Sequence, residues 1–187
     1  MKRILVLLAA WVFLVGCSSV AREPDNLTLV RVLGVDDGEV VVFTAVSGKS
    51  GQGRVERGDG EGEDFRQARE EVPWSGTGTE LSLTGVSYLL VGEDVDLREL
   101  LLWAMEDVDL GASATVWSVE GAAKILLENC EDPAAELELL QLKGVPAPTV
   151  AQAAAELMTE GGTMLPRLGR ENGRMVERGM KEWNRAG

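Results

Sequence analysis

Short runs of β-branched and other apolar residues mark the strands of this chain. Residues 27–34 (LTLVRVLG) and 39–46 (EVVVFTAV) are two such runs, and Asp37-Gly38 lies between them. Asp-Gly readily adopts the positive φ angles of a tight turn, so this pattern predicts an antiparallel hairpin. The apolar runs at 86–91 and 113–119 predict two further strands.

Elsewhere the apolar residues recur at helical spacing. The pattern predicts helices over residues 64–72, 97–108, 120–130, 133–143 and 150–160. Pro133 suits a first helical position, and Thr149 suits the N-cap of the last helix. A hairpin followed by strands and helices in alternation predicts a mixed α/β fold, in which a small mixed β-sheet with an N-terminal hairpin is covered by helices.

Two segments lack a clear apolar period. Residues 48–64 are rich in Gly and in charged residues, which is typical of a loop. After Pro148 and the helix at 150–160, the tail alternates short apolar groups with Arg, Asn and Gly. We therefore expect one domain over 27–145 to hold the core, and the segment 149–187 to add little to it.

The N-terminus has the pattern of a bacterial lipoprotein signal peptide. Lys2 and Arg3 precede an uncharged, mostly apolar stretch at 4–15, which is shorter than the ~20 residues of a spanning helix. Leu14-Val15-Gly16-Cys17 then resembles a lipobox, whose Cys accepts diacylglycerol. We expect residues 1–16 to be removed, Cys17 to carry the lipid and 17–26 to form a tether. The alternative is an ordinary cleaved signal peptide with an incidental Cys.

Charge and composition exclude several classes of function. The net charge is −13, and it becomes −15 once residues 1–16, which hold two basic and no acidic residues, are removed. This acidity argues against binding to nucleic acid or to bare anionic lipid. The chain has no His, which removes Ser-His-Asp and Cys-His catalysis and the commonest zinc ligand. The absence of His leaves carboxylate-only or Lys-based chemistry open, but we expect no enzymatic activity and no cofactor.

Several candidate sites have plainer explanations. The acidic stretch 59–64 departs from a calcium loop because Asp64 stands where the loop needs Gly, and 48–62 lacks the phosphate-loop motif. Cys130 is expected to be a half-buried structural thiol, since Cys17 is its only potential partner and is lipidated. Carboxylate pairs such as Glu70/Glu71 and Glu106/Asp107 are interpreted as solvated faces. These patterns predict no catalytic residue and no metal ligand.

The four tryptophans that follow the predicted signal peptide divide into two groups. Trp103 and Trp117 fall in a predicted helix and a predicted strand, where burial is expected. Trp74 and Trp183 fall in a predicted loop and in the tail. Aromatic side chains are enriched at protein interfaces, so Trp74 and Trp183 are the candidate partner-binding residues.

Taken in order, the motifs resemble those of the Ger(x)C family of spore germination lipoproteins, the C subunits of nutrient germinant receptors. The lipobox is followed by a strand that reaches a Gly-x-Asp turn, an apolar strand that ends in Gly-Glu, a helix start and a Pro-Arg motif. The corresponding segments are Leu33-Gly34-Val35-Asp36, Leu90-Val91-Gly92-Glu93, Gly121-Ala122-Ala123-Lys124-Ile125-Leu126 and Met164-Leu165-Pro166-Arg167-Leu168. Members of the family often carry a His before the Gly-Glu strand, and this chain has none.

The resemblance implies a function by protein contacts. It implies a lipid-anchored protein on the outer face of the inner spore membrane, beside integral A and B subunits, in which 27–145 is the N-terminal domain and 149–187 the partial start of a second. The alternative that the residues leave open is a free-standing extracytoplasmic lipoprotein that binds a small solute, although 171 residues after the signal peptide are few for a two-lobed binder.

Overall fold

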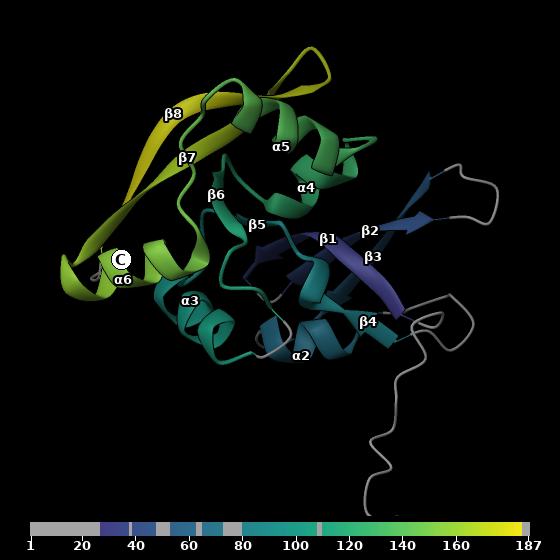
Figure 1. The fold of residues 1–187 in the computed structure, drawn as a ribbon, viewed down its shortest axis with the longest axis horizontal. Coiled ribbons are helices and arrows are strands. Elements are labelled where there is room, and N and C mark those ends of the chain that lie inside the picture. Colours follow the sequence, from purple (N-terminus) through teal and green to yellow (C-terminus); the bar gives the residue numbers. More distant parts are fainter. Residues whose placement is uncertain are drawn as a thin grey trace, which may run out of the picture.

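The computed structural model describes residues 27–37, 39–47, 53–62, 65–72, 80–107 and 110–184. These residues form a mixed β-sheet with helices on both of its faces (Figure 1). The mixed α/β fold expected from the sequence is confirmed. The predicted signal peptide, Cys17, the predicted tether and Trp74 lie outside the described residues.

Seven strands follow the order β3-β2-β1-β5-β6-β7-β8, and β4 pairs with the start of β1. The central strands β1, β5, β6 and β7 are parallel, whereas β2, β3 and β8 are antiparallel to their neighbours. The bounds are β1 Leu27–Asp36, β2 Glu39–Ser47, β3 Gly53–Glu61, β4 Glu80–Ser82, β5 Tyr88–Val91, β6 Thr115–Val119, β7 Gly162–Glu171 and β8 Arg174–Asn184.

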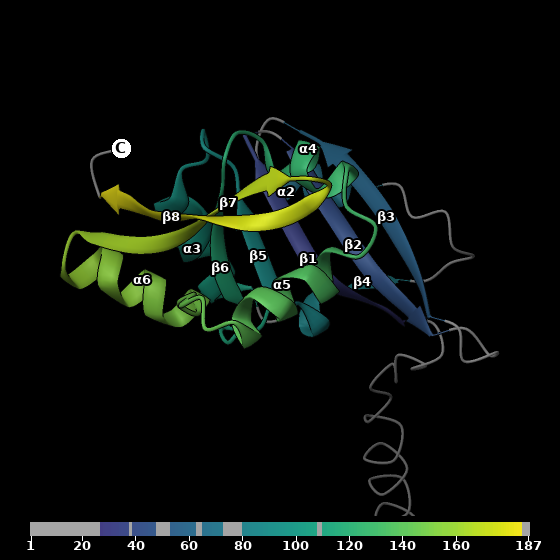
Figure 2. The same ribbon diagram turned by 90° about the horizontal axis from the view of Figure 1, so that it is seen from above.

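The helices divide between two hydrophobic clusters, one on each face of the sheet. On one face α2 (Phe65–Glu70), α3 (Leu97–Glu106) and α6 (Val150–Thr159) pack against residues such as Leu33, Leu89 and Val116. On the other face α4 (Ala123–Glu128) and α5 (Pro133–Leu142) pack around Trp117. Figure 1 shows the sheet between these layers, with α4 and α5 above it and α2, α3 and α6 below it, and Figure 2 views it from the α4 and α5 side. The alternation of strand residues between faces therefore divides one sheet between two cores.

The N-terminal hairpin forms as the turn signal predicts. β1 and β2 pair antiparallel from Val30↔Thr44 to Asp36↔Glu39, so the chain reverses between Asp36 and Glu39. The helices also begin where their caps indicate. Asp132 caps α5 just before Pro133, and Thr149 and Gln152 form a capping box on α6.

The loop predicted over 48–64 is wrong for residues 53–61. These residues form β3, which pairs with β2 along its whole length. The glycines that suggested a loop have a packing role: a Cβ at Gly60 would lie 2.0 Å from the carbonyl oxygen of Ala68. Gly60 therefore lets α2 rest directly on the backbone of an edge strand.

The expectation that the core ends at residue 145 is also wrong. Val150 and Leu157 of α6 and Leu165 of β7 belong to the first hydrophobic cluster, and Leu168 and Met175 belong to the second. Strands β7 and β8 form a long hairpin that closes one edge of the sheet (Figure 2). The segment 149–184 is thus part of the same domain rather than the start of another.

Candidate functional site

Polar residues gather where the parallel strands end. Because β1, β5 and β6 are parallel, their carboxyl ends meet at one edge of the sheet, which is where α/β proteins commonly place functional groups. Asp36 ends β1, Gly92 and Glu93 follow β5, and Glu120 and Gly121 follow β6. We call this group, together with Glu39, Lys124 and Arg167, the carboxyl-edge cluster.

Asp36 joins β1 to the start of α4. Its carboxylate oxygens accept hydrogen bonds from the backbone N–H groups of Ala123, at 2.7 Å, and Lys124, at 2.8 Å. Burial raises the pKa of Asp36 above its usual value, and the two backbone hydrogen bonds oppose that rise. The carboxylate therefore satisfies two backbone donors that α4 would otherwise leave without partners.

Two glycines make the approach of these segments feasible. A Cβ on Gly92 would lie 2.0 Å from Oδ1 of Asp36, so only Gly leaves room for the carboxylate. A Cβ on Gly34 would lie 2.5 Å from Cδ1 of Leu127, so Gly34 lets α4 pack closely on β1. Gly121, with φ +78, turns the chain and accepts the N–H of Glu93 on its carbonyl at 3.1 Å.

Lys124 connects α4 to the antiparallel strands β2 and β3 through ion pairs. Its Nζ lies 3.1 Å from Glu39 of β2 and 3.8–3.9 Å from Glu61 and Asp59 of β3. The hydrogen bond to Glu39 raises the pKa of Lys124, although partial burial opposes that rise. The ammonium group is thereby shared among three carboxylates from two strands.

Arg167 links β7 to the strands beside it. Its guanidinium donates to Glu93 and lies 3.8 Å from Glu120. The Nε atom of Arg167 is buried and has no hydrogen-bond partner. Lys124 and Arg167 are thus both paired with nearby carboxylates, and these ion pairs connect neighbouring strands of the sheet.

The cluster offers hydrogen bonding and paired charges. Among the described residues, neither a hydroxyl nor a thiol takes part in the hydrogen bonds of the cluster. Within the described residues, no three His, Cys, Asp or Glu side chains are grouped so that they could hold a metal ion. Chemically, the cluster can fix the relative positions of β1, β2, β5, β6, β7 and α4.

The structure corrects the environment expected for Trp183. This residue lies in β8, packs partly buried against the first hydrophobic cluster and has a buried Nε1 without a hydrogen-bond partner. The Nζ atom of Lys181 lies 4.0 Å from the centre of its ring. Trp183 is therefore half-buried in a strand rather than exposed in a tail. Trp103 and Trp117 are buried, as expected.

Other residues considered in the sequence include Cys130, the acidic stretch 59–64 and the pair Glu70/Glu71. Cys130 is half-buried, and burial together with Glu136 raises its pKa to about 12. Asp59 and Glu61 lie in β3 beside Lys124 and not in a calcium loop. Glu70 and Glu71 are exposed.

Sequence reasoning identified the motif segments but missed that they form a site. The motifs of the family resemblance include Asp36, Gly92, Lys124 and Arg167, but their positions in the sequence predict no contact between them. One signal was accessible: strand ends in an alternating α/β pattern meet at one edge when the strands are parallel.

None of the helices in the described part of the chain is long and apolar enough to cross a membrane. No family model, no curated protein and no solved structure matches this chain.

Proposed function

We propose that this protein is a lipid-anchored, extracytoplasmic component of a nutrient germinant receptor and that it acts in spore germination through contacts with other proteins. The observation that carries the proposal is the carboxyl-edge cluster. Each of the four segments on which the Ger(x)C resemblance rests contributes a residue to this cluster or packs directly beside it.

These segments are far apart in the sequence. Asp36 and Lys124 are 88 positions apart, and Glu93 and Arg167 are 74 apart, yet each pair is joined by a hydrogen bond. Gly92 provides the space that Asp36 occupies. Motifs that specify one fold must fit one arrangement in space, and these four segments meet at one end of the parallel strands. The convergence therefore supports the resemblance and the function that it implies.

The proposed anchor rests on the N-terminal sequence. An uncharged apolar stretch at 4–15 leads into Leu14-Val15-Gly16-Cys17. Two acyl chains on Cys17 would hold the domain at a membrane surface, because each buried CH₂ contributes ~0.8 kcal/mol. Confinement to that surface raises the effective concentration of membrane partners, so weak contacts suffice.

Metabolic labelling with palmitate tests the anchor. The wild-type chain should incorporate label, and Cys17→Ala should leave unlabelled precursor of higher mass. The matched control is Cys130→Ala, which alters the other thiol of the chain and should label normally. Undiminished labelling of Cys17→Ala would overturn the proposed lipidation.

Germination assays test the biological role. Deletion of the gene should slow nutrient-triggered germination without changing spore yield, and wild-type protein should restore the rate where Cys17→Ala does not. Unchanged germination in the deletion strain would contradict the proposal.

Calorimetry addresses the solute-binding alternative. The purified full chain is titrated with a panel of amino acids and sugars, and we expect no saturable heat. Micromolar binding of one of these solutes would favour the solute-binding lipoprotein instead.

A further inference from the structure

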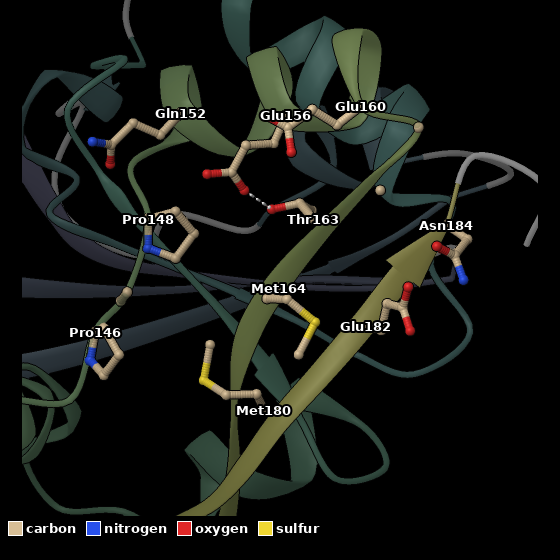
Figure 3. Close-up of a pocket in the computed structure, with 13 residues that line it drawn as sticks. Pro146, Pro148, Gln152, Glu156, Glu160, Thr163, Met164, Met180, Glu182 and Asn184 are labelled. Carbon is tan, nitrogen blue, oxygen red and sulfur yellow. Dashed lines mark hydrogen bonds between the residues drawn. The ribbon is translucent and has the colours of Figure 1, made fainter.

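A groove of about 710 Å³ opens where β7 diverges from the rest of the sheet (Figure 3). Pro146 and Pro148, in the linker between α5 and α6, form one wall. Met164 of β7 and Met180 of β8 form the opposite wall, and α6 closes one end. The groove is distinct from the carboxyl-edge cluster.

The groove exists because the first half of β7 does not pair with β6. β7 pairs with β6 at Arg167 and Leu168 alone, although it extends from Gly162 to Glu171. The linker occupies the earlier part of that edge of β6, since Val116 N–H donates to the carbonyl of Pro148 at 2.8 Å. In the part of the chain that the structure describes, residues 162–166 of β7 therefore have β8 on one side and no strand on the other.

This part of β7 presents an open strand edge to the groove. The N–H of Glu120 donates to the carbonyl of Leu168 at 2.8 Å, so that carbonyl points towards β6. Backbone groups alternate in direction along a strand, and those of Gly162 and Met164 therefore point the same way, into the groove. The facing wall lacks N–H groups at Pro146 and Pro148 and is a poorer partner for an added strand.

The side chains around the groove select for a particular partner. Met164 and Met180 are 46% and 41% exposed, and flexible thioethers adapt to varied apolar groups. Glu156, Glu160 and Glu182 also line the groove, and none of its lining residues is basic. Glu156 accepts a hydrogen bond from Thr163 at 2.6 Å, which leaves Glu160 and Glu182 as exposed acids.

We propose that this groove binds an extended, basic peptide segment of a partner protein, which adds as a short strand to the open edge of β7. Main-chain hydrogen bonds would come from Gly162 and Met164, apolar contacts from Met164 and Met180, and charge complementarity from Glu160 and Glu182. This inference concerns a second site and holds whether or not the protein is a germinant receptor component.

Fluorescence anisotropy with a labelled nine-residue peptide of alternating Lys and Val tests the proposal, with the full chain purified in mild detergent. We expect saturable binding that weakens as salt is added, and none by the matched Glu and Val peptide. Glu160→Lys/Glu182→Lys should weaken binding about tenfold. Glu128→Lys/Glu177→Lys makes the same change in net charge at exposed positions outside the groove, and it should leave affinity nearly unchanged.

Amide hydrogen exchange distinguishes strand addition from charge attraction alone. On peptide binding, the amides of Gly162 and Met164 should become protected. Peptide binding without this protection, equal binding of the acidic peptide, or no saturable binding at millimolar peptide would each overturn the proposal. So would self-association that Glu160→Lys/Glu182→Lys abolishes, because a second copy of the chain would then be the occupant.

Discussion

At the scale of single residues, small side chains determine how closely the elements approach. Gly92 leaves the space that the Asp36 carboxylate fills, and Gly60 leaves the space that α2 fills. Asp36 in turn holds the first backbone N–H groups of α4. A change of one methyl group at such a position therefore acts on several elements at once.

Gly92→Ala should destabilise the protein. The added Cβ would lie 2.0 Å from Oδ1 of Asp36, so the carboxylate must move away from Ala123 and Lys124. We expect the free energy of unfolding in urea to fall by about 1–3 kcal/mol. Gly111→Ala is the matched control, because the nearest atom to its Cβ is Oγ of Ser113 at 3.6 Å. Equal stability of the two variants would contradict the role given to Gly92.

Cys130 should be almost unreactive in the folded protein. Burial, and then Glu136, raise the pKa of its thiol from 9.0 to about 12, so little thiolate exists at pH 8. In a Cys17→Ala background, Cys130 is the sole thiol. Iodoacetamide at pH 8 should label it slowly in buffer and rapidly in urea. Equal rates in the two conditions would show that the thiol is not protected by the fold.

The same pKa shift has a consequence for stability. The folded state holds the proton of Cys130 more tightly than the unfolded state, so the contribution of this group is fully present below pH 9.0 and is lost as pH rises through about 12. In Cys130→Ala, the free energy of unfolding should therefore fall less than in the wild type as pH rises from 9.0 towards about 12.

At the scale of elements, α6 illustrates how a local signal fixes a boundary. Thr149 accepts the N–H of Gln152 at 3.2 Å, and the Gln152 side chain accepts the N–H of Thr149 at 2.9 Å. Gly161, with φ +81, follows the end of the helix. Both ends of α6 are therefore specified by its own residues.

Thr149→Ala should remove half of this capping box. We expect the free energy of unfolding to fall by about 1 kcal/mol, measured by urea denaturation. Thr159→Ala is the control, since Thr159 lies in the last turn of the same helix and donates only to the carbonyl of Ala155. If Thr159→Ala lowers the free energy of unfolding as much as Thr149→Ala does, the loss of the cap does not explain the effect.

At the scale of the whole molecule, one sheet connects the first and last described strands. Deletion of 149–187 removes buried residues from both hydrophobic clusters, including Val150, Leu165 and Leu168. It also leaves one edge of β6 without its partner β7. We expect the truncated chain to lose its cooperative thermal transition, as followed by circular dichroism. A sharp transition in the truncated chain would show that 27–148 is a domain by itself.

A pair of neighbouring residues tests the same point in the intact chain. Leu165 is 0% exposed in β7, whereas Met164 beside it is 46% exposed. Leu165→Ala should lower the free energy of unfolding by about 2–5 kcal/mol, and Met164→Ala by much less. Similar small effects of both changes would indicate that β7 is peripheral to the core.

Elements whose signals lie within their own residues could be predicted from the sequence. Such signals arise from residues that are neighbours in the sequence, so they can be recognised without the fold. They include the Asp37-Gly38 turn signal, Pro133, the Thr149 cap and the apolar periods of the helices at 97–106 and 150–159. These signals were enough to predict the mixed α/β class. Asn172-Gly173, with φ of 50 and 81, is a turn signal of the same kind that could have revealed the β7-β8 hairpin.

Features that depend on partners distant in the sequence became visible in the folded structure alone. β3 is a strand because β2 supplies its hydrogen bonds, and its glycines make room for α2. Trp183 is half-buried because β8 completes the sheet. The carboxyl-edge cluster and the groove beside β7 likewise arise from strand order. Hydrogen bonding between strands and burial are non-local, so no pattern confined to one segment specifies them.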